Sequence, residues 1–252
     1  MRIAIVGGTG TLGSKVVAEL SGRGHEIRVL SRSSTEFPVD LVSGDGLAAA
    51  LDGCAAVIDA SNATSPKRAR QVLVDGSRTL LAAEQAAGVR HHVGVSIVGC
   101  DRVPMGYYRV KTEQERVIED GPVPWSLVCA TQFHELAAAA LTAAGKYRVL
   151  PVPRMQLQTV AAAEVARVIA DVTETGPARR RIQVAGPEIT SAAQLARTWK
   201  SATGRRAAMI GIPVPGKLGR ALRDGGLTAE RPDIRGTMTF AEWLRNGPHP
   251  GL

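Results

Sequence analysis

Three residues near the middle of the chain, Ser96, Tyr107 and Lys111, have the types and spacing for acid–base chemistry on a carbonyl or an alcohol. Tyr107 and Lys111 are four residues apart, so a helix places both on one face. A phenol has an ordinary pKa of about 10, and a lysine ammonium one turn away favours its ionised form. Such a tyrosine can exchange a proton with a substrate oxygen that the Ser96 hydroxyl holds. A surface tyrosine beside a solvated lysine is the alternative interpretation.

A glycine-rich segment lies at the start of the chain, between the apolar run Ile3–Val6 and a helical pattern. A strand that leads into a helix through such a turn points backbone N–H groups and the positive end of the helix dipole at one place, where a pyrophosphate binds. Glycine allows the anion to approach the backbone closely. The pattern therefore predicts a dinucleotide site rather than an ordinary strand–helix turn. Its expected contacts are Gly7, Thr9, Gly10, Thr11, Leu12 and Gly13.

The end of the next expected strand, Glu26–Leu30, indicates which dinucleotide binds. An acidic residue at this position binds the ribose 2′-hydroxyl of NAD, whereas an arginine suits the 2′-phosphate of NADP. Here no acid follows the strand, and Arg32 lies 19 residues after Gly13. Arg32 can make a forked contact with phosphate, to which Ser33 or Ser34 adds a hydroxyl. We predict NADP(H) in preference to NAD(H), with a surface arginine as the alternative.

Other strand ends supply further expected cofactor contacts. Asp45 follows the expected strand Asp40–Val42 and is placed to meet the adenine edge. Ala60 and Ser61 follow Ala56–Asp59 and are expected to border the cofactor from below.

Together these motifs resemble the short-chain dehydrogenase/reductase superfamily, in its atypical branch related to NmrA-like and NAD(P)H-quinone-reductase-like proteins. The resemblance is strong to about residue 165 and looser beyond; it is carried by residues 7–13, Arg32, Ser96–Gly99, Tyr107, Lys111 and Ala130–Phe133. It implies that the segment of Thr131, Gln132 and Phe133 runs past the nicotinamide, and that Lys111 also holds the nicotinamide ribose. Many members of this branch lack the Tyr/Lys pair and serve as cofactor sensors, whereas this chain keeps the pair.

The elements that must position these residues alternate between strand and helix, a pattern typical of a parallel sheet with helices on both faces. The expected strands are Ile3–Val6, Glu26–Leu30, Asp40–Val42, Ala56–Asp59, His92–Ser96 and Trp125–Val128. The expected helices are Thr11–Arg23, Leu47–Leu51, Arg68–Ala87, Tyr107–Glu119 and Phe133–Ala143. We predict a doubly wound, Rossmann-like α/β fold, with the ligand crevice at the carboxyl ends of the strands.

The pattern is less regular after residue 150, where Arg181–Ala185 indicates a strand and Ala161–Val172, Ser191–Ala202 and Lys217–Leu222 indicate helices. We predict an NAD(P)-binding domain over residues 1–150 and a small substrate or lid lobe over residues 151–252, partly added to the same domain. Apolar residues of this lobe either indicate a largely apolar substrate or only pack the lobe against the sheet. They include Met155, Leu157, Ile210, Ile212 and Leu227.

The net charge of +8 is uneven: residues 1–150 hold 16 basic and 15 acidic side chains, and residues 151–252 hold 15 and 8. The basic part attracts an anionic partner or is a solvated face, and no nucleic-acid motif accompanies it. No apolar run is long enough to span a bilayer, and no signal peptide is recognisable, so we expect a cytoplasmic protein without a membrane partner. The three cysteines have neither metal-ligand nor disulfide spacing, and no metal is expected.

The sequence thus favours an NADP(H)-dependent oxidoreductase that acts by hydride transfer on a small, largely apolar carbonyl, alcohol or quinone, with Tyr107 as the acid/base. An NADP-binding regulator that senses redox state is the alternative, and a sugar-nucleotide epimerase or dehydratase is a third interpretation for which the chain is short. The sequence is also compatible with a homodimer or with a protein partner.

Overall fold

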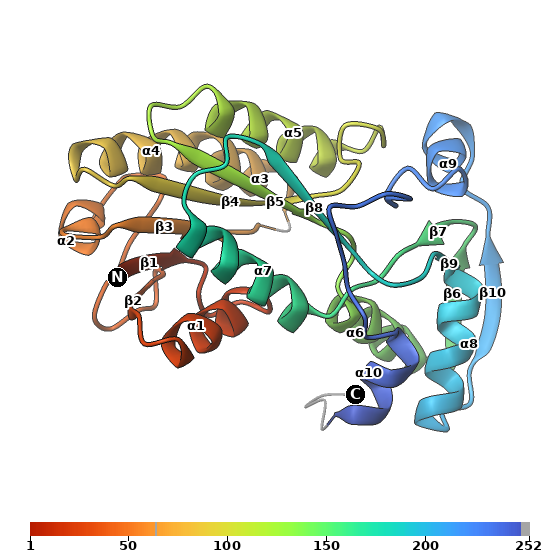
Figure 1. Ribbon diagram of the computed structural model, residues 1–252. Coiled ribbons are helices and arrows are strands. Elements are labelled where there is room, and N and C mark those ends of the chain that lie inside the picture. Colours follow the sequence, from red (N-terminus) through yellow and green to blue (C-terminus); the bar gives the residue numbers. More distant parts are fainter. Residues whose placement is uncertain (64, 248–252) are drawn as a thin grey trace. The chain divides into compact units, whose positions relative to one another are not determined.

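The computed structural model describes residues 1–63 and 65–247 and contains a seven-stranded parallel sheet with helices on both faces (Figure 1). The strand order is β11-β8-β5-β4-β3-β1-β2. Their bounds are β1 Arg2–Val6, β2 Glu26–Leu30, β3 Ala56–Asp59, β4 His91–Ile97, β5 Trp125–Ala130, β8 Arg181–Ala185 and β11 Ile234–Arg235. Because β1 lies between β2 and β3, the chain reverses direction across the sheet there, which is the switch point where such folds bind ligands. The predicted Rossmann-like fold is confirmed.

The helices beside these strands lie in two layers. Figure 1 shows α3 (Pro66–Ala69), α4 (Gly76–Ala86) and α5 (Gly106–Glu119) on one side, and α1 (Gly13–Gly22) and α7 (Ala162–Thr175) on the other. α2 (Leu47–Leu51) precedes β3. The single helix expected over Arg68–Ala87 is divided, since a π-helix, Arg70–Asp75, separates α3 from α4. Both faces of the sheet are covered, which explains why its inner strands β1, β3 and β5 are buried almost throughout.

The strand expected at Asp40–Val42 does not form, and that prediction was wrong. The Asp40 carboxylate accepts hydrogen bonds from the backbone N–H groups of Val42 and Ser43, at 2.7 and 3.4 Å. Gly44 N–H donates to the Asp40 carbonyl at 2.8 Å and closes a turn. An aspartate that binds the backbone two residues on competes with strand pairing. Asp45 therefore follows a turn, and the third strand along the chain is β3.

The chain divides into two compact units, each assembled from three segments. The first unit comprises Met1–Ser96, Gly106–Cys129 and Val165–Ile182. The second unit comprises Ile97–Met105, Ala130–Glu164 and Gln183–Leu252. The units therefore alternate along the sequence instead of meeting at one point. The assignment of cofactor binding to residues 1–150 and substrate binding to residues 151–252 stays a prediction.

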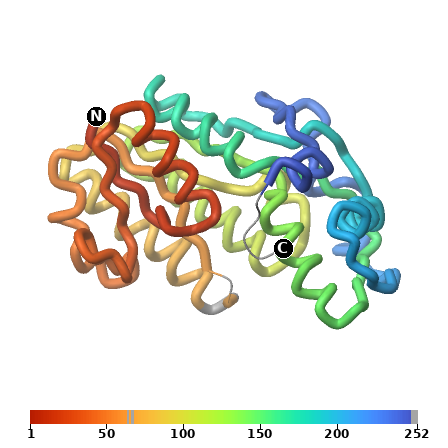
Figure 2. Tube along the Cα trace, turned by 90° about the horizontal axis from the view of Figure 1, so that it is seen from below, coloured from red at the N-terminus to blue at the C-terminus, as the bar shows by residue number. Residues whose placement is uncertain are grey.

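Within the first unit, α1 and α7 lie side by side in both views, although they are far apart in the sequence (Figures 1 and 2). Arg23, which follows α1, binds Asp171 and Glu174 of α7, each at 2.7 Å. The contact joins the first helix of the unit to its last one.

The second unit has its own apolar core and two small sheets. Its elements are α6 His134–Gly145, β6 Val149–Pro153, β7 Gln156–Leu157, β9 Thr190–Ser191, α8 Ala192–Thr203, β10 Ala208–Ile212, α9 Gly216–Arg223 and α10 Phe240–Asn246. β6 and β10 pair in parallel, and β7 and β9 pair antiparallel. Leu150 and Val152 of β6 pack with Trp199 of α8 and Phe240 of α10. Among the described residues, no helix is both long and apolar enough to cross a membrane.

Candidate cofactor site and active site

The glycine-rich turn after β1 is packed so tightly that two of its glycines are required. Gly7 has a φ of +73°, and a Cβ atom there would lie 2.7 Å from the carbonyl oxygen of Ala60. A Cβ atom at Gly13 would lie 2.2 Å from the carbonyl oxygen of Gly7. At Gly10, by contrast, the nearest atom would be 3.3 Å away, and this residue is exposed. The turn thus closes on its inner side and leaves open space beside Gly10.

The N-terminus of α1 has the properties of an anion site. The helix has no side-chain cap and no acidic residue in its first turn. Thr9 and Thr11 are exposed on either side of Gly10, whose N–H donates to the Gly7 carbonyl at 2.9 Å. A helix N-terminus that carries a positive dipole and no capping carboxylate fits a phosphate group. The residues present therefore fit the pyrophosphate of a dinucleotide.

Arg32 and Ser33 are exposed directly after β2, beside the switch point. Arg28, which lies within β2, is already engaged: its guanidinium donates to the carbonyls of Ala49 and Ala50 and lies 4.8 Å from the Phe37 ring centroid. Arg32 is thus the exposed arginine of the two, and its contact with a ligand phosphate stays a prediction. Asp45 is also exposed, in the turn before α2.

The segment after β3 is tied to α4 and α5 by a buried polar network. Asp59 accepts hydrogen bonds from Ser61 N–H at 3.0 Å, Gln114 Nε2 at 3.2 Å and Ser77 Oγ at 3.4 Å. The network fixes Ala60 and Ser61 where the Gly7 turn passes them. Sequence reasoning missed Asp59 and Gln114. A signal was available, because Asp59 ends an apolar strand and Gln114 lies three residues after Lys111.

Tyr107 lies in the first turn of α5, with its side chain directed to the segment after β3. Its hydroxyl donates to Asn62 Oδ1 at 2.8 Å, and its ring packs edge-to-face on Tyr108 with centroids 5.9 Å apart. Asn62 is exposed and Tyr107 is half-buried, so the hydroxyl is accessible from solvent. The structure thereby brings Tyr107 to the strand end that contacts the Gly7 turn. Asn62 was not foreseen from the sequence, since the contact spans 45 residues.

Lys111 lies one turn further along α5 and is 4% exposed. Its ammonium donates to the Val95 carbonyl at 2.7 Å and to Gln114 Oε1 at 2.6 Å. Burial of a charge requires such partners. Lys111 is therefore a fixed positive charge at the carboxyl end of β4, on the helix that carries Tyr107.

Ser96 is placed differently from the expectation that it holds a substrate oxygen. It is buried, and its hydroxyl donates to the carboxylate of Glu115. Glu115 in turn lies 3.2 Å from the guanidinium of Arg181. The Ser96 hydroxyl is thus directed at an ion pair on α5 and β8, while its role toward a substrate stays a prediction.

In the second unit, the segment predicted to pass the nicotinamide is held by hydrogen bonds on both sides. Thr131 N–H donates to the Val184 carbonyl at 3.0 Å. Gln132 donates to the Leu227 carbonyl at 3.0 Å and accepts from Gln158 N–H at 3.2 Å. Phe133 forms a β-bridge with Val160. The segment is therefore fixed within its own unit, and its cofactor role remains a prediction.

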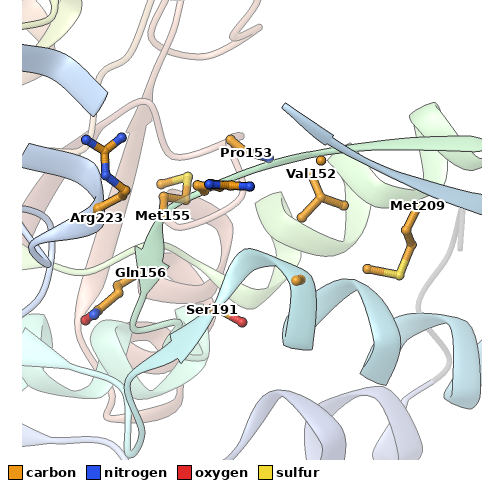
Figure 3. A pocket seen from close by; sticks show the side chains of 10 residues that line it. Val152, Pro153, Met155, Gln156, Ser191, Met209 and Arg223 are labelled. Atoms are coloured by element: carbon orange, nitrogen blue, oxygen red, sulfur yellow. The ribbon is translucent and has the colours of Figure 1, made fainter. Parts of the chain in front are cut away.

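The second unit also contains a cavity of about 460 Å³ (Figure 3). Met155 and Met209 contribute apolar surface, and Arg154 and Arg223 contribute cations. The complete lining is Val152, Pro153, Arg154, Met155, Gln156, Ser191, Ala193, Met209, Gly211 and Arg223. Of the apolar residues singled out in the sequence, Met155 alone belongs to this lining.

The other four residues lie elsewhere in the second unit. Leu157 packs on the apolar core, and Leu227 is buried. Ile210 and Ile212 are 50% and 39% exposed. Within the described ranges, no three His, Cys, Asp or Glu side chains are grouped as a metal site would require.

Residues 7–175 match the family model of NAD(P)H-binding proteins, so the chain belongs to that family. The match confirms the NAD(P)H-binding family that the resemblance implied, and solved structures of a short-chain dehydrogenase/reductase protein and of a quinone oxidoreductase share the fold. The NADPH-dependent quinone oxidoreductase of Escherichia coli, solved with NADPH, has a TM-score of 0.80 at 20% identity, covering 96% of this chain and 98% of that one. A nucleoside-diphosphate-sugar epimerase from Staphylococcus aureus has a TM-score of 0.78 at 15% identity, covering 98% and 100%.

Two curated relatives differ in how much of each protein they match. The NAD(P)H azoreductase of Xenophilus azovorans is 25% identical over 283 aligned positions, which cover 96% of both chains. The Photosystem II assembly factor Ycf39 of Synechocystis sp. is 37% identical over 117 residues, which cover 41% of this chain and 36% of that protein. The chain thus matches only about a third to a half of the length of such Ycf39 proteins. The chain has the NAD(P)H-binding oxidoreductase fold, with quinone reductase and azoreductase neighbours.

Proposed function

We propose that the protein is an NADP(H)-dependent oxidoreductase that acts on a small, largely apolar carbonyl, alcohol or quinone. The observation that carries this proposal is the position of the Tyr107 hydroxyl, 2.8 Å from Asn62 Oδ1 in the segment that contacts the Gly7 turn. A proton donor therefore lies at the edge of the sheet where the fold binds its dinucleotide.

Each group of residues has its own proposed role. The Gly7 turn, with Gly10, and the N-terminus of α1 hold the pyrophosphate, and Arg32 with Ser33 holds the 2′-phosphate. When bound, NADPH supplies the hydride. Tyr107 donates a proton to the substrate oxygen in reduction and accepts it back in oxidation. The buried Lys111 ammonium lowers the free-energy cost of the resulting phenolate.

The substrate class rests on two further observations. The lining of the 460 Å³ cavity is mostly apolar, with Met155 and Met209 as flexible side chains that adapt to varied ligands. The relatives and neighbours named above include a quinone oxidoreductase and an azoreductase. Quinones and azo compounds therefore belong in the first substrate panel, together with aldehydes and ketones. The three buried, unbridged cysteines suit a reducing compartment, and we propose the cytoplasm.

An NADP-binding regulator is a second candidate, and one observation favours it. The hydroxyl of Ser96 donates to Glu115, and this contact supports a role for Ser96 other than holding a substrate oxygen. The partial matches to Photosystem II assembly factors are consistent with a role other than turnover.

The deciding experiment measures binding and turnover on the same preparation. NADPH and NADH binding is followed by cofactor fluorescence, and NADPH consumption is then recorded with the substrate panel. We expect tighter binding of NADPH and turnover of at least one quinone, azo compound, aldehyde or ketone. Tight NADPH binding without turnover of any panel member, or of the matching alcohols in reverse, would reject the enzyme in favour of the regulator.

A further inference from the structure

The small parallel sheet β6–β10 buries one face and exposes the other. Leu150 and Val152 point into the core around Trp199, because successive residues of a strand alternate between faces. The opposite face consists of Val149, Pro151, Ala208, Ile210 and Ile212, which are all exposed and which we call the outer face. Ile210 is 50% exposed, and Tyr147, just before β6, is 83% exposed. An apolar face of this kind on a water-facing surface indicates a binding surface.

A basic cavity of about 400 Å³ adjoins the outer face, and we call it the basic pocket. Its lining is Arg148, Lys200, Arg205, Arg206, Ala207 and Ala208, so four of its six residues are cations and none is acidic. Ala208 belongs to both features and pairs with Val149 in the sheet. The basic pocket and the outer face are therefore continuous.

Contacts within the protein hold the side chains and the backbone of the basic pocket in place. Lys200 Nζ donates to the Ala207 carbonyl at 2.5 Å, and the Arg205 guanidinium lies 5.7 Å from the Trp199 ring centroid. Arg148 has a φ of +57°, a conformation that residues other than glycine rarely adopt. Backbone strain of this kind persists only where the surroundings hold it, and it is found most often at functional sites.

The charge around this surface excludes a second copy as its natural partner. Neither residues 136–163 nor residues 189–223 contain an acidic residue. The latter stretch contains Arg197, Lys200, Arg205, Arg206, Lys217, Arg220 and Arg223. Two such surfaces would bring like charges together, which opposes self-association.

The geometry of β6 also excludes the addition of a strand at its free edge. Arg148 and Arg154 direct their backbone groups to β10, since Ala208 N–H donates to the Arg148 carbonyl at 2.8 Å and Arg154 N–H to the Ile212 carbonyl at 3.3 Å. The odd-numbered residues, Pro151 and Pro153 among them, therefore face the free edge. Proline has no N–H to donate, so this edge does not accept a third strand. A partner that binds beside β6 therefore rests on the outer face.

We propose that the outer face and the basic pocket form a peripheral binding surface for membranes containing anionic phospholipids. The pocket takes a lipid phosphate, and Tyr147, Ile210 and Ile212 lie at the boundary between headgroups and acyl chains. Nucleic acid fits less well, because successive bases stack on several aromatic rings, whereas the five residues of the outer face are aliphatic and Tyr147 alone contributes a ring to the proposed surface. The sequence-based expectation of no membrane partner rested on the absence of a spanning segment, whereas this surface lies on a bilayer. The proposal is independent of the oxidoreductase activity.

The test is co-sedimentation of the full chain with phosphatidylcholine vesicles and with phosphatidylcholine vesicles containing phosphatidylserine. We expect binding to the anionic vesicles alone, weakening as salt rises. Arg206→Ala and Arg148→Gly should each weaken binding roughly fivefold, the effect of one cation at an anionic surface. Glycine suits the φ of Arg148, so the second variant removes charge without adding strain. Ile210→Ser should weaken binding by a similar factor.

Matched controls are Ile189→Ser and Arg231→Ala, which alter exposed residues of the same types elsewhere in the second unit. Circular dichroism confirms that all variants are folded. Equal losses in variants and controls, or no binding to either vesicle, would overturn the proposal. The proposal would also be overturned if inorganic phosphate displaced the protein from the vesicles while Ile210→Ser bound them as the wild type does. That result would assign the basic pocket to free phosphate. Binding of polyglutamate in place of vesicles, with the same variant dependence, would instead identify an acidic protein as the partner.

Discussion

The hydroxyl of Tyr107 and the side-chain amide of Asn62 are joined by a hydrogen bond of 2.8 Å, in which Tyr107 is the donor. The bond connects the first turn of α5 to the segment after β3, where the chain passes the Gly7 turn. It orients the phenol toward the carboxyl end of the sheet in the absence of substrate. In the proposed acid–base role, the Tyr107 hydroxyl must release Asn62 Oδ1 and donate to a substrate oxygen instead.

Tyr107→Phe should bind NADPH as the wild type does and lose roughly 10²- to 10⁴-fold in kcat, because the ring still packs and the proton donor is gone. Tyr108→Phe is the matched control, since it removes a hydroxyl from the neighbouring ring on the same helix. Steady-state NADPH consumption with a panel substrate measures both. Full activity of Tyr107→Phe would reject its role as acid/base.

Lys111→Ala should lower both kcat and NADPH affinity, since the residue supplies the positive charge near Tyr107. It should also lower the free energy of unfolding by about 1–3 kcal/mol, because the Val95 carbonyl and Gln114 Oε1 lose their donor. Arg109→Ala, at an exposed position of the same helix, is the control. Denaturant titration and the pH–rate profile are the measurements. A loss of stability with an unchanged profile would leave Lys111 a structural role only.

Gly10→Val should leave the protein folded, because a Cβ atom at this position has only the Gly7 carbonyl oxygen nearby, at 3.3 Å. It should abolish NADPH binding, because the side chain would occupy the space that the pyrophosphate needs. Gly13→Ala should instead impair folding, since its Cβ would lie 2.2 Å from the Gly7 carbonyl oxygen. Calorimetric titration with NADPH and thermal unfolding separate these effects. Unchanged affinity in folded Gly10→Val would place the pyrophosphate elsewhere.

Arg32→Ala should remove most of the preference for NADPH over NADH, a factor of roughly ten to a hundred for a charge-assisted contact to phosphate. NADH affinity should not change, and it serves as the internal control. Fluorescence titrations with both cofactors give the ratio. Equal wild-type affinities for NADPH and NADH would contradict the prediction before any variant is made.

Burial lowers the pKa of His91 to about 4, so the neutral ring is the folded form at neutral pH. The unfolded chain, with a histidine pKa near its ordinary value of about 6.5, binds more protons between these values, so stability should fall as pH falls through this window. The contribution is roughly 2–3 kcal/mol by pH 4.5. His91→Gln should reduce the slope of unfolding free energy against pH between 6.5 and 4.5. Parallel slopes in the two proteins would contradict this assignment.

The sequence predicted the sheet well, because inner strands such as β1, β3 and β5 are buried on both faces, while β2 and β8 alternate between polar and apolar residues. The bounds of β2, β3 and β8 were predicted as the structure has them. The turn at Asp40 was missed because a short apolar stretch outweighed the aspartate that closes it. The pairing of β6 with β10 was missed as well, since it joins residues some sixty positions apart in a region without clear periodicity.

The candidate site shows the same limit. Positions near a motif, such as the Gly7 turn and the Tyr107–Lys111 pair, follow from local spacing. The partners of these residues do not, because Asn62 and Glu115 become partners only through tertiary packing. Residue types therefore predicted which groups are present, and the structure was needed to show that Ser96 is bound to a carboxylate.

The pairing of α1 with α7 constrains how this chain is made. Arg23 leaves the ribosome early, yet its partners Asp171 and Glu174 are synthesised about 150 residues later. At about 5–20 residues per second, the face of the sheet that α7 covers waits many seconds for its last helix. A fragment that stops at residue 150 lacks α7 entirely, and its apolar sheet face would be open to aggregation.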